Sequence, residues 1–253
     1  MSNIRIVARL DVKGPDLIKG INLEGVRKLG DPHERARAYY VDGIDEIIYM
    51  DAVATLYGRN SLAELVRSTA EDVFVPMTVG GGLKTVEDVD SMMRAGADKV
   101  AINTAALRQP DLITEVAERF GAQAMVLSIE AKRKGGSTWE AYTDNGREKT
   151  GRDVIAWARE AEQRGAGEIL LTSVDNEGLQ EGFDLQLTKA VADAVSVPVI
   201  ASGGMGRPEH LVDLVGSSGA DAVAIASIFH YKKFKAAEIR AYARTNGIMV
   251  REI

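Results

Sequence analysis

The chain contains an internal repeat in which matched segments lie about 120 positions apart. GIDEIIYMD, TVGGG and KVAINTAA in the first half correspond to GAGEILLTS, IASGGMG and AVAIASIFH in the second. Glu46 and Glu168 are 122 positions apart, and Gly80 and Gly203 are 123 positions apart. A repeat of this length is a half-domain, so the chain is expected to fold as two similar halves that close on each other. We expect a single domain over residues 1–253, with half-barrels at about 1–122 and 123–253.

Short β-branched runs alternate with amphipathic helical stretches along the chain, a pattern typical of helices that cover a parallel sheet. The 253 residues suit one α/β barrel. The predicted class is therefore α/β, a (β/α)8 TIM barrel with a twofold half-barrel repeat. Helical segments are predicted at 31–43 and 151–165, among others. The predicted strands are 5–12, 46–51, 75–79, 99–103, 124–130, 168–173, 198–202 and 222–226.

Two connections are long and polar, at residues 13–31 and 132–150. They follow the first and the fifth predicted strands, which occupy equivalent places in the two halves. Long connections in compact domains are usually functional. We expect each half to carry one mobile loop beside the active site.

Composition excludes several classes of function. A net charge of −6 and a pI near 5.3 argue against nonspecific nucleic-acid binding. No apolar run approaches the roughly 18 residues of a membrane helix, and the N-terminus lacks the pattern of a signal peptide. We therefore expect a cytoplasmic protein that contacts neither membrane nor nucleic acid. The chain has no cysteine, and its three histidines are not at ligand spacing, so neither a metal site nor a cofactor is expected.

Glycines and hydroxyl side chains cluster at the carboxyl ends of the predicted strands, where the chemistry of such barrels is located. Exposed backbone N–H groups at these positions bind anions. Two clusters occur in register in the two halves, although glycines also serve simple tight turns. We expect two phosphate sites on opposite sides of the barrel mouth, and hence a small-molecule substrate phosphorylated at both ends. The clusters are Gly80, Gly81, Gly82, Asn103 and Thr104, and Gly203, Gly204 and Ser227.

Two carboxylates, Asp11 and Glu130, end the first and fifth predicted strands and are 119 positions apart. They are expected to face each other across the mouth, where a pair of carboxylates can divide into a general acid and a general base. The alternative is that both are solvated residues at strand ends. Side chains alternate between the two faces of a strand, and Asp51 lies at an outward-facing position of its strand. It is therefore expected to bind a loop or orient a neighbour.

Four charged residues, Arg5, Glu46, Lys99 and Glu168, lie at the starts of predicted strands with inward parity. Two positive and two negative charges in this arrangement are expected to close the floor of the barrel as a ring of ion pairs. An ordinary solvated rim is the alternative interpretation.

Over nearly its full length the chain resembles the cyclase subunit of imidazole glycerol phosphate synthase. The matching strings are LDVKG with Lys19, GDP, TVGGG, GADKVAINTAA, RGAGEILLTS and ASGGMG. The resemblance implies a (β/α)8 lyase of histidine biosynthesis that forms a heterodimer with a glutaminase subunit docked on the barrel floor. Ammonia is then expected to pass through the barrel to a bisphosphorylated aminoimidazole carboxamide ribonucleotide derivative.

The resemblance also assigns roles to particular residues. It implies that Asp11 and Glu130 are the acid and the base, and that the four charged residues of the floor form an ammonia gate. The residues that it implies for substrate and phosphate binding are Lys19, Gly82, Asn103, Thr104, Gly178, Gly203, Gly204 and Ser227.

The chain departs from the family pattern within the site. Glu130 stands where the family has aspartate, and Arg9 stands where it typically has a small residue. Glu177 and Leu179 alter the loop after the sixth strand. These departures keep two alternatives open: a paralogue that delivers ammonia to another acceptor, such as a surface-glycan sugar whose carboxylate Arg9 binds, and a non-catalytic partner of a glutaminase. The predicted specificity residues are Arg9, Asp51, Ser128 and Glu177.

Overall fold

Eight parallel strands form a closed barrel in the computed structural model, which describes residues 3–52 and 62–252. β1 pairs with both β4 and β12, and β7 pairs with both β6 and β10, so the sheet has no free parallel edge. The predicted (β/α)8 barrel is confirmed. The barrel strands are β1 (Arg5–Lys13), β4 (Glu46–Asp51), β5 (Met77–Gly80), β6 (Lys99–Ile102), β7 (Met125–Gly135), β10 (Glu168–Ser173), β11 (Val199–Ser202) and β12 (Ala222–Ile225).

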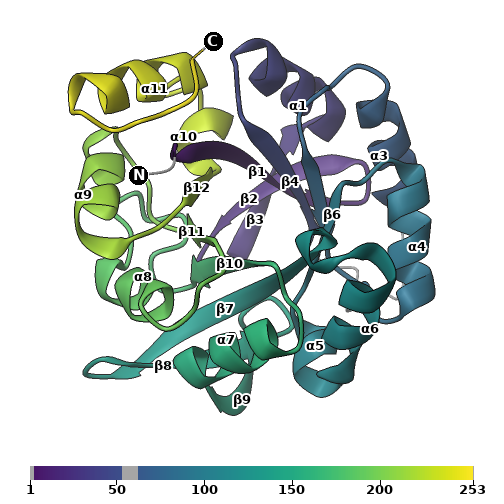
Figure 1. Cartoon of the computed structure of the whole chain (residues 1–253). Helices are drawn as coiled ribbons and strands as arrows, with labels where there is room; N and C mark the ends of the chain where they lie inside the picture. The colour runs from purple at the N-terminus through teal and green to yellow at the C-terminus, as the bar shows by residue number, and fades with distance from the viewer. Residues whose placement is uncertain (1–2, 53–61, 253) are drawn as a thin grey trace.

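Helices surround the barrel on its outside, as the view in Figure 1 shows. Helix α4 illustrates why they form: Thr85 caps its first turn through a capping box with Asp88, and Gly96 ends it with a φ of 117°. The helices are α1 (Pro32–Val41), α3 (Leu62–Ala70), α4 (Val86–Ala95), α5 (Thr104–Arg108), α6 (Asp111–Phe120), α7 (Val154–Gln163), α8 (Leu185–Ala192), α9 (Glu209–Ser218), α10 (Ser227–His230) and α11 (Ala236–Thr245), with a 3-10 turn, η1, at Ala122–Ala124.

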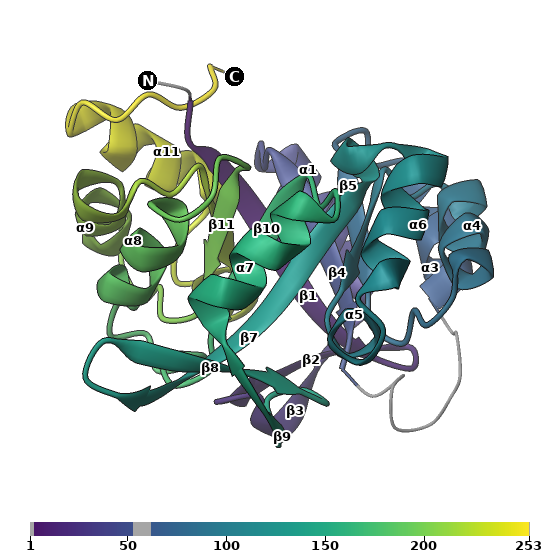
Figure 2. The ribbon, with the colours of Figure 1, turned by 60° about the horizontal axis from the view of Figure 1, so that its bottom comes forward.

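Both long connections form β-hairpins, so their prediction as loops is wrong. β2 (Asp16–Ile21) and β3 (Glu24–Gly30) extend from β1, and β8 (Thr138–Thr143) and β9 (Glu148–Asp153) extend from β7. The two hairpins gather at the carboxyl end of the barrel in Figure 2, opposite the chain termini. The physical reason is that β1 and β7 project beyond the barrel and offer backbone partners to antiparallel strands, whatever the polarity of the side chains.

The apolar side chains divide between two clusters. The larger cluster lies between the outer faces of the strands and the helices, and it includes Trp139 and Trp157. The smaller cluster fills the interior of the barrel, so this interior is a packed core rather than an open pore. Its members are Val7, Ile48, Ala101, Val126, Leu170, Ile200, Ala222 and Ala224.

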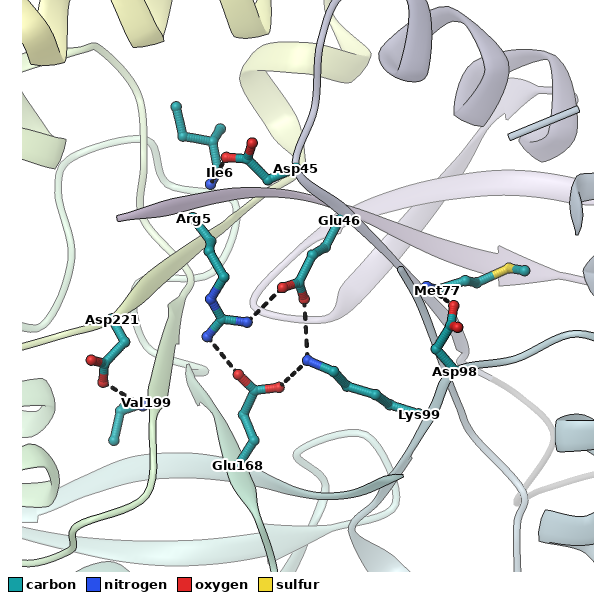
Figure 3. A network of polar contacts seen from close by, with 10 residues as sticks. All are labelled: Arg5, Ile6, Asp45, Glu46, Met77, Asp98, Lys99, Glu168, Val199 and Asp221. Atoms are coloured by element: carbon teal, nitrogen blue, oxygen red, sulfur yellow. Dashed lines mark hydrogen bonds and ion pairs between the residues drawn. The ribbon is translucent and has the colours of Figure 1, made fainter. Parts of the chain in front are cut away.

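Three aspartates at strand starts tie neighbouring strands together at the amino end of the barrel. Asp45 accepts a hydrogen bond from the backbone N–H of Ile6 at 2.8 Å. Asp98 and Asp221 make the same contact to Met77 and Val199 (Figure 3). The corresponding position before β10 is Gly167, whose N–H donates to the carbonyl oxygen of Met125 instead.

The division into half-barrels at about residue 122 stays a prediction, and each proposed half carries one hairpin.

Within the described part of the chain, none of the helices has the length and apolar character needed to cross a membrane.

Candidate active site

Asp11 and Glu130 line one pocket at the carboxyl ends of the strands. Asp11 comes from β1 and Glu130 from β7, and each side chain is largely buried, with 6% of the residue exposed. Asp51, at the end of β4, lines the same pocket. The pocket therefore holds these three carboxyl groups from three different strands, together with that of Asp144 from the β8–β9 turn.

The first predicted phosphate cluster lies in this pocket. Gly82, Asn103 and Thr104 line it together with the cationic side chains of Lys84 and Arg108. The side-chain N–H of Asn103 donates to the backbone of the β8–β9 hairpin, while its buried Oδ1 has no hydrogen-bond partner among the described residues. The glycine turn and the two cations favour an anionic ligand here, and Arg108 also forms an ion pair with Asp144 at 2.9 Å.

The second cluster lines a separate small pocket at the ends of β10, β11 and β12. A side chain at Gly203, whose φ is 94°, would bring a Cβ atom to 2.6 Å from the carbonyl oxygen of Ser173. Glycine is therefore required for the tight turn that exposes the backbone. The residues that line this pocket include Glu177, Gly178, Gly203, Gly204 and Ser227.

Lys19 lies between the two pockets rather than in either of them. It projects from β2 and is 2% exposed. Its Nζ forms an ion pair with Glu177 and lies 3.8 Å from Oδ2 of Asp11. Lys19 thus links the hairpin to a candidate catalytic carboxylate and to the rim of the second pocket.

The tip of the β2–β3 hairpin lies against the loop after β10. The side chain of Asn22 donates to the carbonyl oxygens of Val174 and Asp175 at 2.8 and 2.9 Å. On the other side, Asn145 donates to the carbonyl oxygen of Leu23 at 3.2 Å. Both Asn22 and Leu23 have positive φ angles, as a two-residue hairpin turn requires.

The two candidate catalytic carboxyls have opposite electrostatic environments. Burial raises the pKa of Glu130 to about 7, despite a hydrogen bond from the Gly146 N–H at 2.7 Å and the charge of Arg9. Burial alone would also raise the pKa of Asp11, but Arg9 and Lys19 lower it below its usual value. At neutral pH, Asp11 is ionised and Glu130 is poised to exchange a proton.

The predicted specificity residues do not all lie in the same place. Arg9 lines the main pocket and is buried in the barrel interior, and Ser128 is buried on β7 beneath Glu130. Glu177 borders the second pocket. Asp51 reaches the main pocket although it lies off the inward parity of β4, because the strand ends there.

The four charged residues at the strand starts form a closed set of ion pairs (Figure 3). Arg5 lies 2.7 Å from Glu46 and 2.5 Å from Glu168, measured between nitrogen and carboxylate oxygen. Lys99 lies 3.4 Å from Glu46 and 2.8 Å from Glu168. This charged ring occupies the amino end of the barrel, and the apolar interior cluster separates it from the mouth.

Sequence reasoning missed several residues of the site. Arg9 Nη1 donates to the hydroxyls of Thr172, at 2.8 Å, and Ser202, at 3.1 Å. The inward parity of β10 and β11 was a usable signal for both hydroxyls. The contact of Gly146 with Glu130 had no signal in the sequence, because it depends on the path of the β8–β9 hairpin.

In the described ranges, 3–52 and 62–252, no three His, Asp or Glu side chains are grouped to hold a metal ion.

The chain is similar in sequence to proteins of known function. The family model described as histidine biosynthesis protein matches residues 5–235. A curated relative from Legionella pneumophila, imidazole glycerol phosphate synthase subunit HisF, is 63% identical over 209 residues. That match covers 83% of this chain and 99% of the relative.

Proposed function

The chain belongs to the histidine biosynthesis protein family, and we propose that it is the cyclase subunit of an imidazole glycerol phosphate synthase. This subunit uses ammonia to convert a bisphosphorylated aminoimidazole carboxamide ribonucleotide derivative. The products are imidazole glycerol phosphate and aminoimidazole carboxamide ribonucleotide. The match to a histidine-pathway relative gives no support to amidation of a surface-glycan sugar.

The observation that carries the proposal is the order of groups across the barrel mouth. An anion pocket with Gly82, Asn103 and Thr104 lies on one side, and a second with Gly203 and Gly204 lies on the other. The carboxyls of Asp11 and Glu130 belong to the strands between these pockets in the barrel order. A substrate with a phosphate at each end fits this order, since its reacting centre then lies beside both carboxyls.

The chemistry requires proton transfers that the two carboxyls are suited to provide. When ammonia attacks carbon, the new bond leaves a positively charged nitrogen that must lose a proton, and the departing nitrogen must gain one. Asp11 and Glu130 have different pKa values in one pocket, which allows one to carry charge while the other exchanges a proton. Lys19, 3.8 Å from Asp11, helps to keep that carboxyl ionised.

We infer that a glutaminase subunit docks at the amino end of the barrel. The charged ring lies at this end, and its four side chains are proposed as the gate through which ammonia enters. Val41 and Phe74, at the same end, are 76% and 72% exposed, so they are apolar side chains that a docked partner would bury. A partner that covers them would deliver ammonia directly above the ring.

The test is turnover of the bisphosphorylated substrate with an ammonium salt, using the purified chain alone. We expect the wild type to form imidazole glycerol phosphate and the Asp11→Asn variant to lose more than about 100-fold in turnover. The exposed variant Val41→Ser serves as a matched control that should retain ammonium-dependent turnover. If the wild type binds the substrate without turnover, the proposed activity is wrong.

A further inference from the structure

Arg9 crosses the interior of the barrel just above the apolar layer. Its guanidinium starts from β1 and reaches Thr172 on β10 and Ser202 on β11. In the barrel order, β12 lies between β1 and β11, so the side chain spans the interior instead of following its own strand. Thr172 is in register with Glu130 on the adjacent strand β7. Arg9 therefore extends from Asp11 toward the strand pair that carries Glu130.

The only carboxylate at hydrogen-bond distance from Arg9 among the described residues is Asp11, whose Oδ1 lies 2.9 Å from Nε. Arg9 is 3% exposed, and an arginine at such depth is strongly destabilising without a charged partner. Its other two hydrogen bonds go to neutral hydroxyls. The ion pair with Asp11 therefore supplies the negative charge that this guanidinium needs.

Asp11 is held between two cations. Arg9 contacts Oδ1, and Nζ of Lys19 lies 3.8 Å from Oδ2. Burial lowers the pKa of nearby His230 to about 4, so this imidazole is uncharged at neutral pH. The titratable groups that face Asp11 are Arg9 on β1, Lys19 on β2, Asp51 on β4, Glu130 on β7, Glu177 after β10 and His230 on α10.

Glu130 is not held between cations in this way. Within the described ranges its carboxylate makes no ion pair, and its hydrogen bond comes from the backbone N–H of Gly146. The charges that act on it are the more distant Arg9, Asp11 and Asp144. Two carboxyls that line one pocket thus differ in whether a cation is bound directly to them.

We propose that Arg9 is a positioning residue that clamps Asp11 as a permanent carboxylate, so that the proton transfers of the reaction fall to Glu130. The inference rests on the proposed function and assigns separate roles within its pair of carboxyls. Asp11 then stabilises the positive charge that forms on the attacking nitrogen. Glu130 takes a proton from that nitrogen and returns one to the departing nitrogen. The longer side chain of glutamate gives this group the reach for both positions.

The first test is the pH profile of turnover at a fixed concentration of un-ionised ammonia. We expect the wild-type profile to follow one ionisation near pH 7, as set by Glu130. In Arg9→Met, the loss of the guanidinium removes a charge that lowers the pKa of both Glu130 and Asp11, so the acid limb should move up by about one pH unit or more. Arg9→Lys preserves the charge and should restore much of the wild-type profile. Thr172→Val is the matched control, because it removes a contact of Arg9 but leaves the ion pair, so its acid limb should stay in place.

A second measurement does not depend on turnover. Carboxyl carbon NMR of the intact chain, with Asp and Glu labelled, should show Glu130 titrating near pH 7 and Asp11 staying ionised to well below its usual range. Titration of Asp11 near neutrality, or an Arg9→Met profile that matches the wild type, overturns the inference. Absence of wild-type turnover contradicts the proposed function instead, while the titration still decides the role of Arg9.

Discussion

Lys19 and Glu177 form a buried ion pair that joins the β2–β3 hairpin to the loop after β10. The two side chains are 2% and 3% exposed by residue, so neither charge is well solvated. The pair thus makes the position of the hairpin depend on a residue 158 positions away in the chain.

Removing one member of this pair should destabilise the protein more than removing both. Glu177→Leu leaves Lys19 buried with only Asp11 nearby, and we expect a loss of about 3 kcal/mol in the free energy of unfolding. The double variant Lys19→Met/Glu177→Leu buries no unpaired charge from this pair and should lose less. Urea unfolding of the wild type, the single variants Lys19→Met and Glu177→Leu, and the double variant measures the coupling; strictly additive losses would show that the two charges do not interact.

The stability of the protein should depend on Glu130 in a defined pH range. Because burial raises the pKa of Glu130 from 4.5 to about 7, the folded state holds this proton more tightly than the unfolded chain. That contribution is complete below about pH 4.5 and is lost as the pH rises through about 7. Glu130→Gln removes it, so the difference in unfolding free energy should change by on the order of 3 kcal/mol across this range. Urea unfolding at several pH values measures the slope, and parallel curves for the two proteins would contradict the expectation.

Breaking the charged ring should separate the two sources of ammonia. Lys99→Met leaves Glu46 and Glu168 with Arg5 as their remaining partner in the ring. With a glutaminase partner present, we expect glutamine-driven turnover to fall by on the order of tenfold, equivalent to about 1.4 kcal/mol. Turnover with added ammonium salt should change much less, because that ammonia can enter at the mouth. Equal losses with both nitrogen sources would count against a gate at this position.

Asp45 should matter more for stability than its structural counterpart Asp98. Both accept a strand N–H at 2.8 Å, but Asp45 also lies 2.9 Å from the buried guanidinium of Arg240 on α11. Asp45→Ala leaves Arg240 without that charge, and a loss of about 3–5 kcal/mol is expected. Asp98→Ala removes a single hydrogen bond at an exposed residue and should cost about 1 kcal/mol. Thermal and urea unfolding compare the pair, and similar losses would show that the ion pair with Arg240 adds little.

The barrel could be predicted because its signals are local. Residues 46–51 and 168–173 were predicted with the bounds that β4 and β10 have, since polar residues mark both ends of a buried apolar run. The hairpins could not be predicted in the same way. Their backbone partners are the projecting ends of β1 and β7, so polar composition alone indicated loops.

The alternation of inward-facing and outward-facing side chains along each strand is the signal from which the site could be predicted. It directed Arg9, Asp11 and Glu130 inward, and the structure places all three at one pocket. Parity could not tell which groups these side chains contact. The ion pair of Arg9 with Asp11 and its reach to Thr172 depend on the diameter of the closed barrel, which no single strand encodes.

The hairpin tip from Gly20 to Leu23 packs against the loop after β10. A Cβ atom at Gly178, beside the second pocket, would come to 2.6 Å from the carbonyl oxygen of Gly20, so the tip rests directly on that rim. Any side chain at position 178 would therefore push the tip away from the loop after β10 and strain the two hydrogen bonds of Asn22 to that loop. The glycine after β10 thus sets how closely a hairpin from the other half of the chain can approach the second pocket.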